Sequence, residues 1–368
     1  MIERSCLVFE SRELGEGETM IPKTMRAVVL TGHGGPEKLQ FRDDVPVPDV
    51  GPGQVLVRVH AAGVNNTDIN TRVGWYSSDV ISATADVAGT VDVGGWDGAL
   101  QFPRIQGGDL CGTIVAVGDG VSWSAGTRVT SQINIPRPTE DNKVSFIALG
   151  SEIDGAFAQY CLLEATEIFD VSISPLSDVE VAAMPCAYGT AWNLLMRSGV
   201  TFGDRVLVTG ASGGVGLAAV QLAVYLGAVV TGQASSTKAD VVRKMGASDV
   251  ISRGETPHIE LYDAVIDVVG GQLWPDIIRA IKPGGNYAVS GAIAGPIVKA
   301  DLREIYLRDI TLHGCSFSPR NVFAKFVDLL NLGTIRPLIS RVYSLDSIGR
   351  AQEDFMSKTL PGKLVLIP

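Results

Sequence analysis

In the first half of the chain, apolar and polar residues alternate in short runs that are separated by glycine and proline turns. The stretch 54–64, QVLVRVHAAGV, shows this alternation, which is typical of a strand with one exposed face. Similar runs at 26–30 and 114–118 predict further strands. We therefore expect a β-rich unit here, with a short helix that begins near Asn65.

The pattern changes near Pro185, where helical periods begin to alternate with short apolar strands. The expected helices are 187–197, 217–226, 237–245 and 274–281, and the expected strands are 206–209, 229–231, 264–267 and 286–290. Such alternation is the signature of an α/β fold with a doubly wound parallel sheet. This part of the chain is therefore expected to form a Rossmann-type nucleotide-binding domain.

The last part of the chain returns to short strands after a helix at 322–332, and so resembles the first half. We expect one catalytic domain built from both ends of the chain. Its segments are residues 25–186 and 319–368, and the dinucleotide-binding domain, 187–318, is inserted between them. Residues 1–24 are expected to form an N-terminal extension.

The stretch from Arg205 to Gly216, RVLVTGASGGVG, combines a buried strand, a glycine turn and the start of a helix. In this order the elements form a pyrophosphate site, because backbone N–H groups face the anion and only small residues let the backbone come close. The cofactor contacts expected in this turn are Ala211, Ser212, Gly213, Gly214, Val215 and Gly216.

The residues after the next strand bear on the choice of cofactor. NAD-binding domains carry an acidic residue about 20 positions after the turn, which binds the ribose 2′-hydroxyl. Here that position is Gln233, and Ser235, Ser236 and Lys238 follow it. Hydroxyls and an ammonium suit a 2′-phosphate, which a carboxylate would repel. We therefore expect NADPH rather than NADH; the alternative is that one of the serines only caps the next helix.

Composition excludes several classes of function. The chain has 368 residues, of which 46% are hydrophobic, and a formal net charge of −10, which disfavours nucleic acid and anionic membranes as partners. No apolar run approaches the roughly 20 residues of a membrane span. The N-terminal stretch lacks the apolar core of a signal peptide, and the five cysteines are scattered. We therefore expect a cytoplasmic protein without a disulfide framework.

Several motifs resemble the medium-chain dehydrogenase/reductase superfamily, and within it the zinc-free NADPH:quinone oxidoreductase branch. They include MRAVVLTGHGGPEKLQ, GPGQVLVRVHAAGVNNTD, GGDLCGTIVAVGDGV, VLVTGASGGVGLAAVQLA, DAVIDVVGG and the closing GKLVLIP. The resemblance implies a GroES-like catalytic domain around a Rossmann domain, with the cofactor in the cleft between them. It also implies a homodimer, and further cofactor contacts at Thr190, Val269, Ser290 and Gly291.

The same resemblance bears on metal binding. Zinc-dependent members of the superfamily hold the catalytic metal with Cys, His and Cys, and here Asn65 and the Gly107-Gly108 pair stand in the first two positions. Only Cys186 matches a ligand, with Asp109 as a nearby acid. Because catalytic zinc normally has three protein ligands, we expect no zinc and no other metal.

Without a metal to polarise a carbonyl, the site suits acceptors that are already electrophilic, namely quinones and α,β-unsaturated carbonyls (enones). We expect Asn65 to donate a hydrogen bond to the acceptor, and Asn66, Asn70 and Tyr76 to orient it or supply a proton. The alternative role of the asparagines is helix capping.

Two other functions stay open: an alcohol dehydrogenase with atypical zinc ligands, and a non-catalytic NADPH-binding protein. The stretch 82–102 is either a lid over the substrate or a surface insertion.

Overall fold

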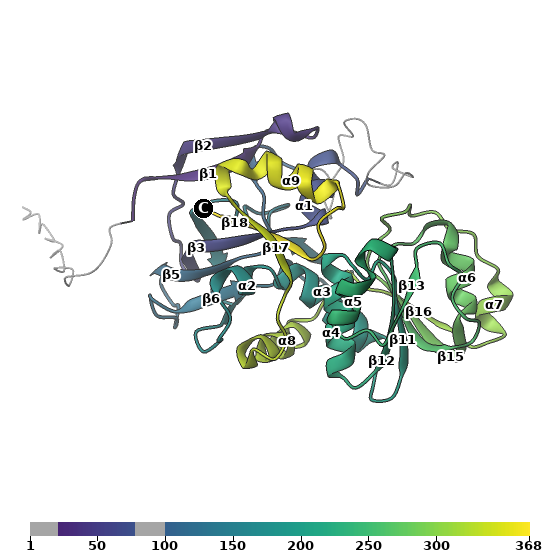
Figure 1. Ribbon diagram of the computed structural model, residues 1–368. Coiled ribbons are helices and arrows are strands. Elements are labelled where there is room, and N and C mark those ends of the chain that lie inside the picture. Colours follow the sequence, from purple (N-terminus) through teal and green to yellow (C-terminus); the bar gives the residue numbers. More distant parts are fainter. Residues whose placement is uncertain (1–20, 78–99) are drawn as a thin grey trace, which may run out of the picture.

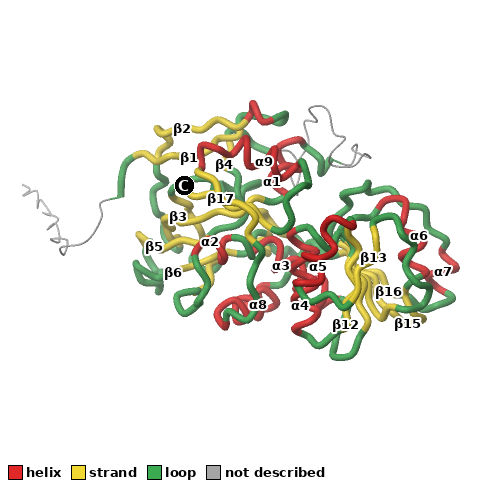
Figure 2. The backbone as a smooth tube through the Cα atoms, viewed as in Figure 1, coloured by secondary structure: helices red, strands yellow, loops and turns green. Residues whose placement is uncertain are grey.

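Two units lie side by side in the structure, a computed structural model that describes residues 21–77 and 100–368 (Figure 1). One unit is built mainly of strands, and the other has a central sheet flanked by helices (Figure 2). The C-terminal strands, yellow in Figure 1, lie beside the purple N-terminal ones, so both ends of the chain contribute to the first unit. The lid or insertion predicted at 82–102 lies almost wholly outside the described residues, as does most of the extension 1–24.

The first unit is organised around a mainly antiparallel sheet. Its spatial order is β10 (Ile168–Asp170), β6 (Arg128–Ser131), β5 (Cys111–Val117), β3 (Gln54–Val64), β18 (Lys363–Ile367) and β17 (Ile339–Ser344), and β9 (Tyr160–Glu164) also pairs with β3. Strand β18 runs antiparallel to β3 with Leu364 opposite Val64, which places the C-terminal segment beside the start of the Asn65 helix. The predicted β-rich catalytic domain is confirmed.

Smaller elements complete this unit. They are the sheet β2 (Leu39–Pro46), β1 (Thr24–Leu30) and β4 (Arg104–Ile105), the pair β7 (Asn134–Pro136) and β8 (Phe146–Ala148), and the helices α1 (Asn66–Val73), α2 (Asp178–Ala182) and α9 (Ile348–Met356). Helix α1 begins directly after β3, so the end of that strand fixes where the helix starts.

The second unit contains a wholly parallel sheet. Its order is β13 (Asp249–Ser252), β12 (Val229–Ala234), β11 (Arg205–Val208), β14 (Tyr262–Asp267), β15 (Ile281–Val289) and β16 (Thr311–Gly314), and its helices are α4 (Gly214–Tyr225), α5 (Ala239–Lys244), α6 (Trp274–Arg279) and α7 (Leu302–Tyr306). Numbered along the chain this order is 3-2-1-4-5-6, the dinucleotide-binding arrangement, in which the direction of winding reverses beside the first strand. The predicted doubly wound sheet is confirmed.

Helices α3 (Pro185–Arg197) and α8 (Arg320–Leu332) join the two units. One hydrophobic cluster runs from the parallel sheet through both helices and includes Cys111 and Val365 of the antiparallel sheet. The helices thus pack against both units, and the domain boundaries at 187 and 318 stay predictions.

In the parallel unit, the sequence patterns misplace the boundary between α6 and β15 and miss some short elements. The helix predicted at 274–281 ends at Arg279, and β15 begins at Ile281 rather than at 286. In the sequence, Pro283-Gly284-Gly285 resembles a turn, yet it lies within β15. The strand can contain it because the pairing of β15 with β14 shifts register there. Among the missed elements, β13 and α7 are four and five residues long, which is too short for a clear period.

Within the described residues there is neither a disulfide nor a membrane-spanning helix. Cys111, Cys161, Cys186 and Cys315 are free and buried. No helix in this part of the chain has both the length and the apolar character needed to cross a bilayer.

Candidate active site

The glycine turn lies between β11 and α4, where the winding of the parallel sheet reverses. Gly213 caps α4 without a side-chain hydrogen bond, so no side chain of the cap competes for the first N–H groups of the helix. A Cβ on Gly216 would lie 2.2 Å from the Gly210 carbonyl oxygen, so the close turn requires glycine at that position. These features fit a dinucleotide pyrophosphate. Ala211 and Ser212 are buried inside the turn, whereas Gly213, Gly214 and Val215 are at least partly accessible.

Other predicted cofactor contacts follow the neighbouring strands. Val269 comes just after β14, and Ser290 and Gly291 follow β15, so all three lie at carboxyl ends of parallel strands and are half-buried. Ligands of doubly wound sheets bind at this edge. The roles of these residues as contacts stay predictions.

A small pocket between the two units contains Thr190. It lies on α3 and shares the pocket with Asn193 and Ser318. The Asn193 Oδ1 and Ser318 Oγ atoms are buried and have no hydrogen-bond partner among the described residues. Buried polar atoms of this kind favour a polar ligand group in the pocket.

The residues expected at the adenosine ribose lie at the end of β12. Gln233 is buried within that strand, and its Nε2 donates to the carbonyl oxygen of Glu255 at 3.0 Å. Ser235 makes no side-chain capping bond, and its hydroxyl lies 3.1 Å from that of Thr237. Ser236 is exposed and Lys238 half-buried. The capping alternative is therefore not observed at Ser235.

Three cations, Lys238, Arg253 and Lys358, lie next to these serines. Lys238 donates to the carbonyl oxygen of Lys358, which belongs to the catalytic unit. Burial and the charge of Arg253 lower the pKa of Lys238, and burial and the charge of Lys238 lower the pKa of Lys358 to about 8. None of the three has an ion-pair partner within the described residues. Such a cluster of unpaired cations favours an anionic ligand.

Across the cleft, Asn65 lies at the junction of β3 and α1 in a buried polar cluster. Its Nδ2 donates to Asp109 Oδ2 at 2.9 Å, and its Oδ1 accepts from the Lys363 ammonium. Lys363 also pairs with Asp109 at 3.2 Å, and Asp109 Oδ1 accepts from the backbone N–H of Cys186 at 2.6 Å. Asp68 accepts from the backbone N–H of Asn65 at 2.8 Å and so braces the start of α1.

The cluster does not fit a zinc ion. Burial, followed by the charge of Asp109, raises the pKa of the Cys186 thiol to about 12, which disfavours the thiolate that zinc requires. The ammonium of Lys363 already neutralises Asp109. Within residues 21–77 and 100–368 no three His, Cys, Asp or Glu side chains are placed to hold a metal. The zinc-free character stays a prediction that metal analysis tests.

The other predicted catalytic residues extend from this cluster along α1. Asn66 Nδ2 donates to Asn70 Oδ1 at 3.1 Å, and Asn66 Oδ1 lies 3.4 Å from the ammonium of Lys358. Burial raises the pKa of Tyr76 well above its usual value, although hydrogen bonds from Asn70 and Thr67 partly oppose the shift. The structure therefore places all four predicted residues together, with their chemical roles untested.

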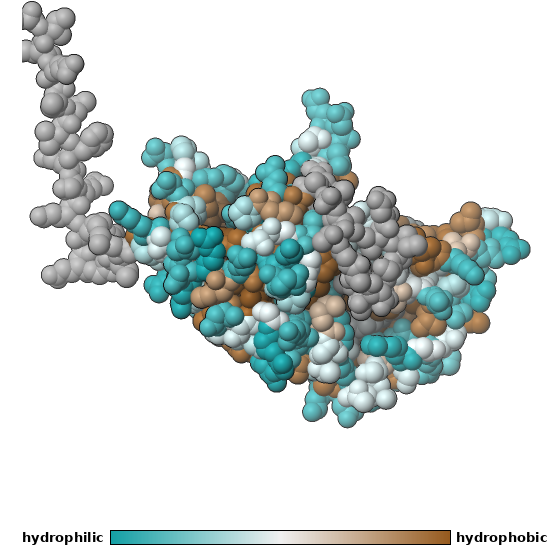
Figure 3. Space-filling view, turned by 90° about the horizontal axis from the view of Figure 1, so that it is seen from above, coloured by the Kyte–Doolittle hydropathy of each residue, from teal (hydrophilic) through white to brown (hydrophobic). Residues whose placement is uncertain are grey.

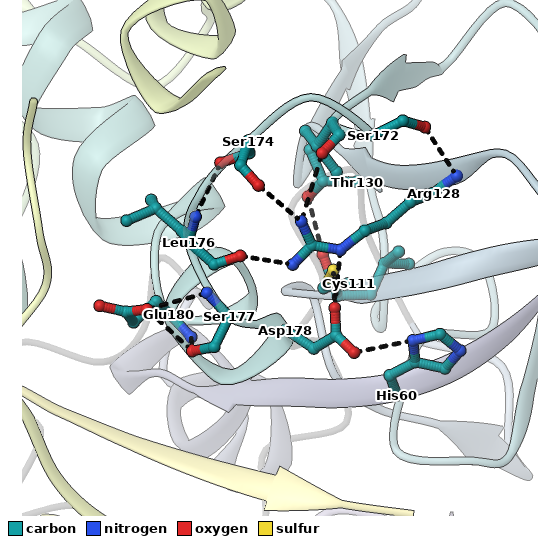
Figure 4. Close-up of polar contacts among 12 residues, drawn as sticks. His60, Cys111, Arg128, Thr130, Ser172, Ser174, Leu176, Ser177, Asp178 and Glu180 are labelled. Atoms are coloured by element: carbon teal, nitrogen blue, oxygen red, sulfur yellow. Dashed lines mark hydrogen bonds and ion pairs between the residues drawn. The ribbon is translucent and has the colours of Figure 1, made fainter. Parts of the chain in front are cut away.

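A second polar cluster in the catalytic unit surrounds Asp178 at the start of α2 (Figure 4). Asp178 accepts hydrogen bonds from Arg128 at 2.7 Å and from His60 at 2.9 Å, and Cys111 Sγ lies at 3.4 Å. Arg128 donates as well to the carbonyl oxygen of Leu176 at 2.9 Å. These bonds tie α2 to the antiparallel sheet, so the cluster is a structural clamp.

Sequence reasoning missed Lys363 and Lys358. A signal for Lys363 is present, because it directly precedes the apolar run Leu364–Ile367, whose first three residues are buried, and lysine is rarely buried without a partner. Its partners, however, lie 298 and 254 positions away along the chain. Only the fold brings them together.

Comparisons with known proteins agree with this arrangement. A family model for the alcohol dehydrogenase GroES-like domain matches residues 51–173, and one for zinc-binding dehydrogenases matches residues 214–331. The two matches fall on the antiparallel and the parallel unit.

Three similar proteins match over nearly the whole chain. A crystal structure from Sinorhizobium meliloti 1021, described only provisionally as an alcohol dehydrogenase, is 42% identical over 95% of this chain and 98% of that one, with a TM-score of 0.85. Human quinone oxidoreductase is 28% identical, over 94% of this chain and 98% of its own. Crotonyl-CoA carboxylase/reductase AntE in complex with NADP is 26% identical over 97% of both chains, with a TM-score of 0.80. The chain thus belongs to the medium-chain dehydrogenase/reductase superfamily.

Proposed function

We propose that this protein is an oxidoreductase that reduces quinones or α,β-unsaturated carbonyls with hydride from NADPH, without zinc. One observation carries the proposal: a turn that fits a dinucleotide pyrophosphate borders a buried amide site whose donor set does not suit a metal. The names of human quinone oxidoreductase and of crotonyl-CoA carboxylase/reductase indicate these two acceptor types, since crotonyl-CoA is an α,β-unsaturated thioester.

The cation cluster supports NADPH as the cofactor. Lys238, Arg253 and Lys358 lie beside Ser235 and Ser236, where a 2′-phosphate would find opposite charge and hydroxyl donors. Gln233 replaces the acidic residue that would favour NADH. The related AntE structure contains NADP, which is consistent with this assignment.

In the proposed reaction, bound NADPH supplies the hydride and the chain supplies polar groups for the acceptor. Asn65 has one amide N–H with only a distant partner, the carbonyl oxygen of Gly63 at 3.5 Å. This N–H donates to the acceptor oxygen and stabilises the negative charge that develops there. The Tyr76 phenol gives the proton that completes the reduction, and Asn66 and Asn70 orient the acceptor.

The test is a panel of quinones, enones and enoyl-CoA thioesters, with NADPH and NADH compared by loss of the reduced cofactor's absorbance. We expect turnover with at least one acceptor class and a kcat/KM for NADPH about tenfold or more above that for NADH, which corresponds to about 1.4 kcal/mol. Lys358→Met and Gln233→Asp should each reduce this preference, whereas Lys325→Met, at an exposed position on α8, should not. No turnover with any acceptor would leave the non-catalytic alternative.

Metal analysis separates this proposal from an alcohol dehydrogenase with atypical ligands. Protein purified without chelators should contain far less than one zinc per chain and should keep its activity after dialysis against a chelator. Stoichiometric zinc, together with oxidation of simple alcohols, would contradict the proposal.

We also propose a homodimer that forms through the outer edge of the parallel sheet. Among the described residues, strand β16 pairs with β15 and with no other strand, which leaves its other edge open. Leu312, Ile297, Leu302 and Leu307 are exposed near this end of the sheet, and apolar surface is visible at the end of the molecule that this unit forms (Figure 3). Such an edge is a template for pairing with a second copy. Leu312→Lys should shift the mass measured by light scattering from dimer to monomer, and a monomeric wild type would refute the proposal.

A further inference from the structure

The most unusual group in the site is the ammonium of Lys363. Its side chain is 3% exposed, and the carboxylate of its partner Asp109 is completely buried. Removing two charges from water costs several kcal/mol per ion, and a pair of this kind is a weak source of stability. A lysine held in this way therefore calls for a reason beyond folding.

The position of Lys363 follows from strand pairing on both sides of the cleft. The register of β18 with β3 places Leu364 opposite Val64, so Lys363 faces the start of α1. The preceding Gly362 forms a bridge with Gly213 and donates its N–H to the Ser212 carbonyl oxygen at 3.2 Å. Lys363 is thus attached to the cofactor turn by its backbone and to the Asn65 site by its side chain.

The ammonium has three acceptors: Asn65 Oδ1, Asp109 Oδ2 at 3.2 Å and the Val64 carbonyl oxygen at 3.2 Å. An ammonium carries three donors and no acceptor, whereas an asparagine amide has one acceptor end and one donor end. The oxygen of Asn65 must therefore face Lys363. The NH₂ group then faces Asp109 and keeps one N–H without a strong internal partner.

The stem of the lysine also touches the cofactor turn. A Cβ built on Gly214, the first residue of α4, would lie 3.0 Å from the Lys363 Cδ atom. The side chain therefore runs from the helix that receives the pyrophosphate to the amide that receives the acceptor. Any change in its length or charge acts on both places.

We propose that Lys363 is a positioning residue that takes over the fixed positive charge of a catalytic metal: it sets the orientation of the Asn65 amide and holds Asp109 against it beside the cofactor turn. This deepens the proposed reductase function and rests on it for the consequence in catalysis. The oriented N–H of Asn65 is what the acceptor oxygen meets, and a rotated amide would present its oxygen instead.

The experiment compares Lys363→Met, Lys363→Arg, Asp109→Asn and the double variant Lys363→Met/Asp109→Asn by thermal melting and by kcat with saturating NADPH. Lys363→Met alone should lower Tm, because it leaves the buried carboxylate unpaired. The double variant removes both charges and should recover most of the wild-type Tm. Its kcat should still be roughly tenfold to 100-fold below that of the wild type, as expected for a misplaced reacting group. Lys363→Arg, which keeps the charge, should recover part of kcat. Full recovery of both Tm and kcat in the double variant would overturn the proposal, because the lysine would then only balance Asp109.

A second measurement is independent of the reaction. The side-chain amide signals of Asn65 in ¹⁵N-labelled protein can be assigned by their loss in Asn65→Asp. These signals should be slow to exchange with water in the wild type and in Lys363→Arg, and should exchange faster in the double variant. Unchanged exchange in the double variant would refute the positioning role. If the Asn65 amide exchanged faster in the double variant but the wild-type protein reduced no acceptor, the positioning role would stand and only the proposed function would be refuted.

Discussion

Two carboxylates of the catalytic unit show how differently the same chemistry is used in one domain. Asp109 is completely buried and is held by Asn65, by Lys363 and by the backbone of Cys186. The side chain of Asp178 is 39% exposed and is held by Arg128 and His60. Each has a lysine or arginine and a second side-chain donor, but one cluster borders the cofactor turn and the other braces a helix on the sheet.

The two clusters differ in the free-energy cost of desolvating their charges and in the elements that lie beside them. The Asp178 cluster keeps contact with water, so its desolvation cost is small and its bonds serve to tie α2 in place. The Asp109 cluster gives up hydration completely, which is unfavourable for stability. Buried charged groups in a cleft are more often retained for function. The comparison therefore separates a clamp from a candidate active site within the same sheet.

The largest expected difference between the clusters is in stability. Asp109→Asn leaves the Lys363 ammonium buried without its counter-charge, and we expect a loss of about 3–5 kcal/mol in the free energy of unfolding. Asp178→Asn, at a partly exposed position, should cost only about 1 kcal/mol. Urea denaturation of the two variants measures both values. Equal losses would break the distinction between the clusters.

The second prediction compares Asn65 and His60, which each donate a hydrogen bond to one of the two carboxylates. Asn65→Ala should lower kcat by about 100-fold, because it removes a donor to the developing negative charge. His60→Ala should leave kcat within about twofold, because the His60 side chain bonds to Asp178 of the clamp. Steady-state kinetics with the best acceptor from the panel measures both effects. A large loss of kcat in His60→Ala would place the clamp in the catalytic machinery.

The third prediction concerns pH. Burial, opposed in part by the backbone N–H of Asn65, raises the pKa of Asp68 to about 7 from an ordinary 3.8. The folded protein then holds a proton that the unfolded chain releases, so the Asp68 contribution to stability decreases as pH rises from about 4 to 7. The limiting slope is about 1.4 kcal/mol per pH unit. Asp68→Asn should remove this slope, which unfolding curves of the variant and the wild type over this range will measure.

Asp178 should show the opposite sign. Burial alone would raise its pKa, but the hydrogen bond and charge of Arg128 outweigh burial and hold the pKa below its ordinary value. Its stabilising contribution is therefore present above about pH 4 and is lost as pH falls further. If the contributions of Asp68 and Asp178 to the free energy of unfolding changed in the same direction with pH, the environments assigned to the two carboxyl groups would be wrong.

The smallest expected effect is at Cys186. Its bond to Asp109 comes from the backbone N–H, which alanine keeps, and its thiol is protonated. Cys186→Ala should therefore change kcat/KM by less than about twofold, as for a small packed apolar residue. A loss of activity comparable to that of Asn65→Ala would show that the thiol itself takes part, and would favour the metal-dependent alternative.

The comparison also shows which parts of the site were readable in advance. Asn65, Asn66, Asn70 and Tyr76 were named from a segment of twelve residues, and the structure places them together because α1 and the turn after it keep neighbours in sequence close in space. Lys363 and Lys358 were not named. Each approaches α1 from the C-terminal segment, and no local pattern near residue 65 indicates that a strand from the far end of the chain will pair there.

The amino-acid sequence by itself determined the β-rich unit, the doubly wound parallel sheet and the glycine turn, because side-chain period and the steric need for small residues are local properties. It also determined the absence of an acid at Gln233 and of metal ligands at Asn65 and Gly108. The tertiary structure alone decided that β18 pairs with β3 while Gly362 bridges to Gly213. That double attachment brings the ammonium of Lys363 to Asn65 and Asp109, since charges hundreds of residues apart meet only after the strands have found their register.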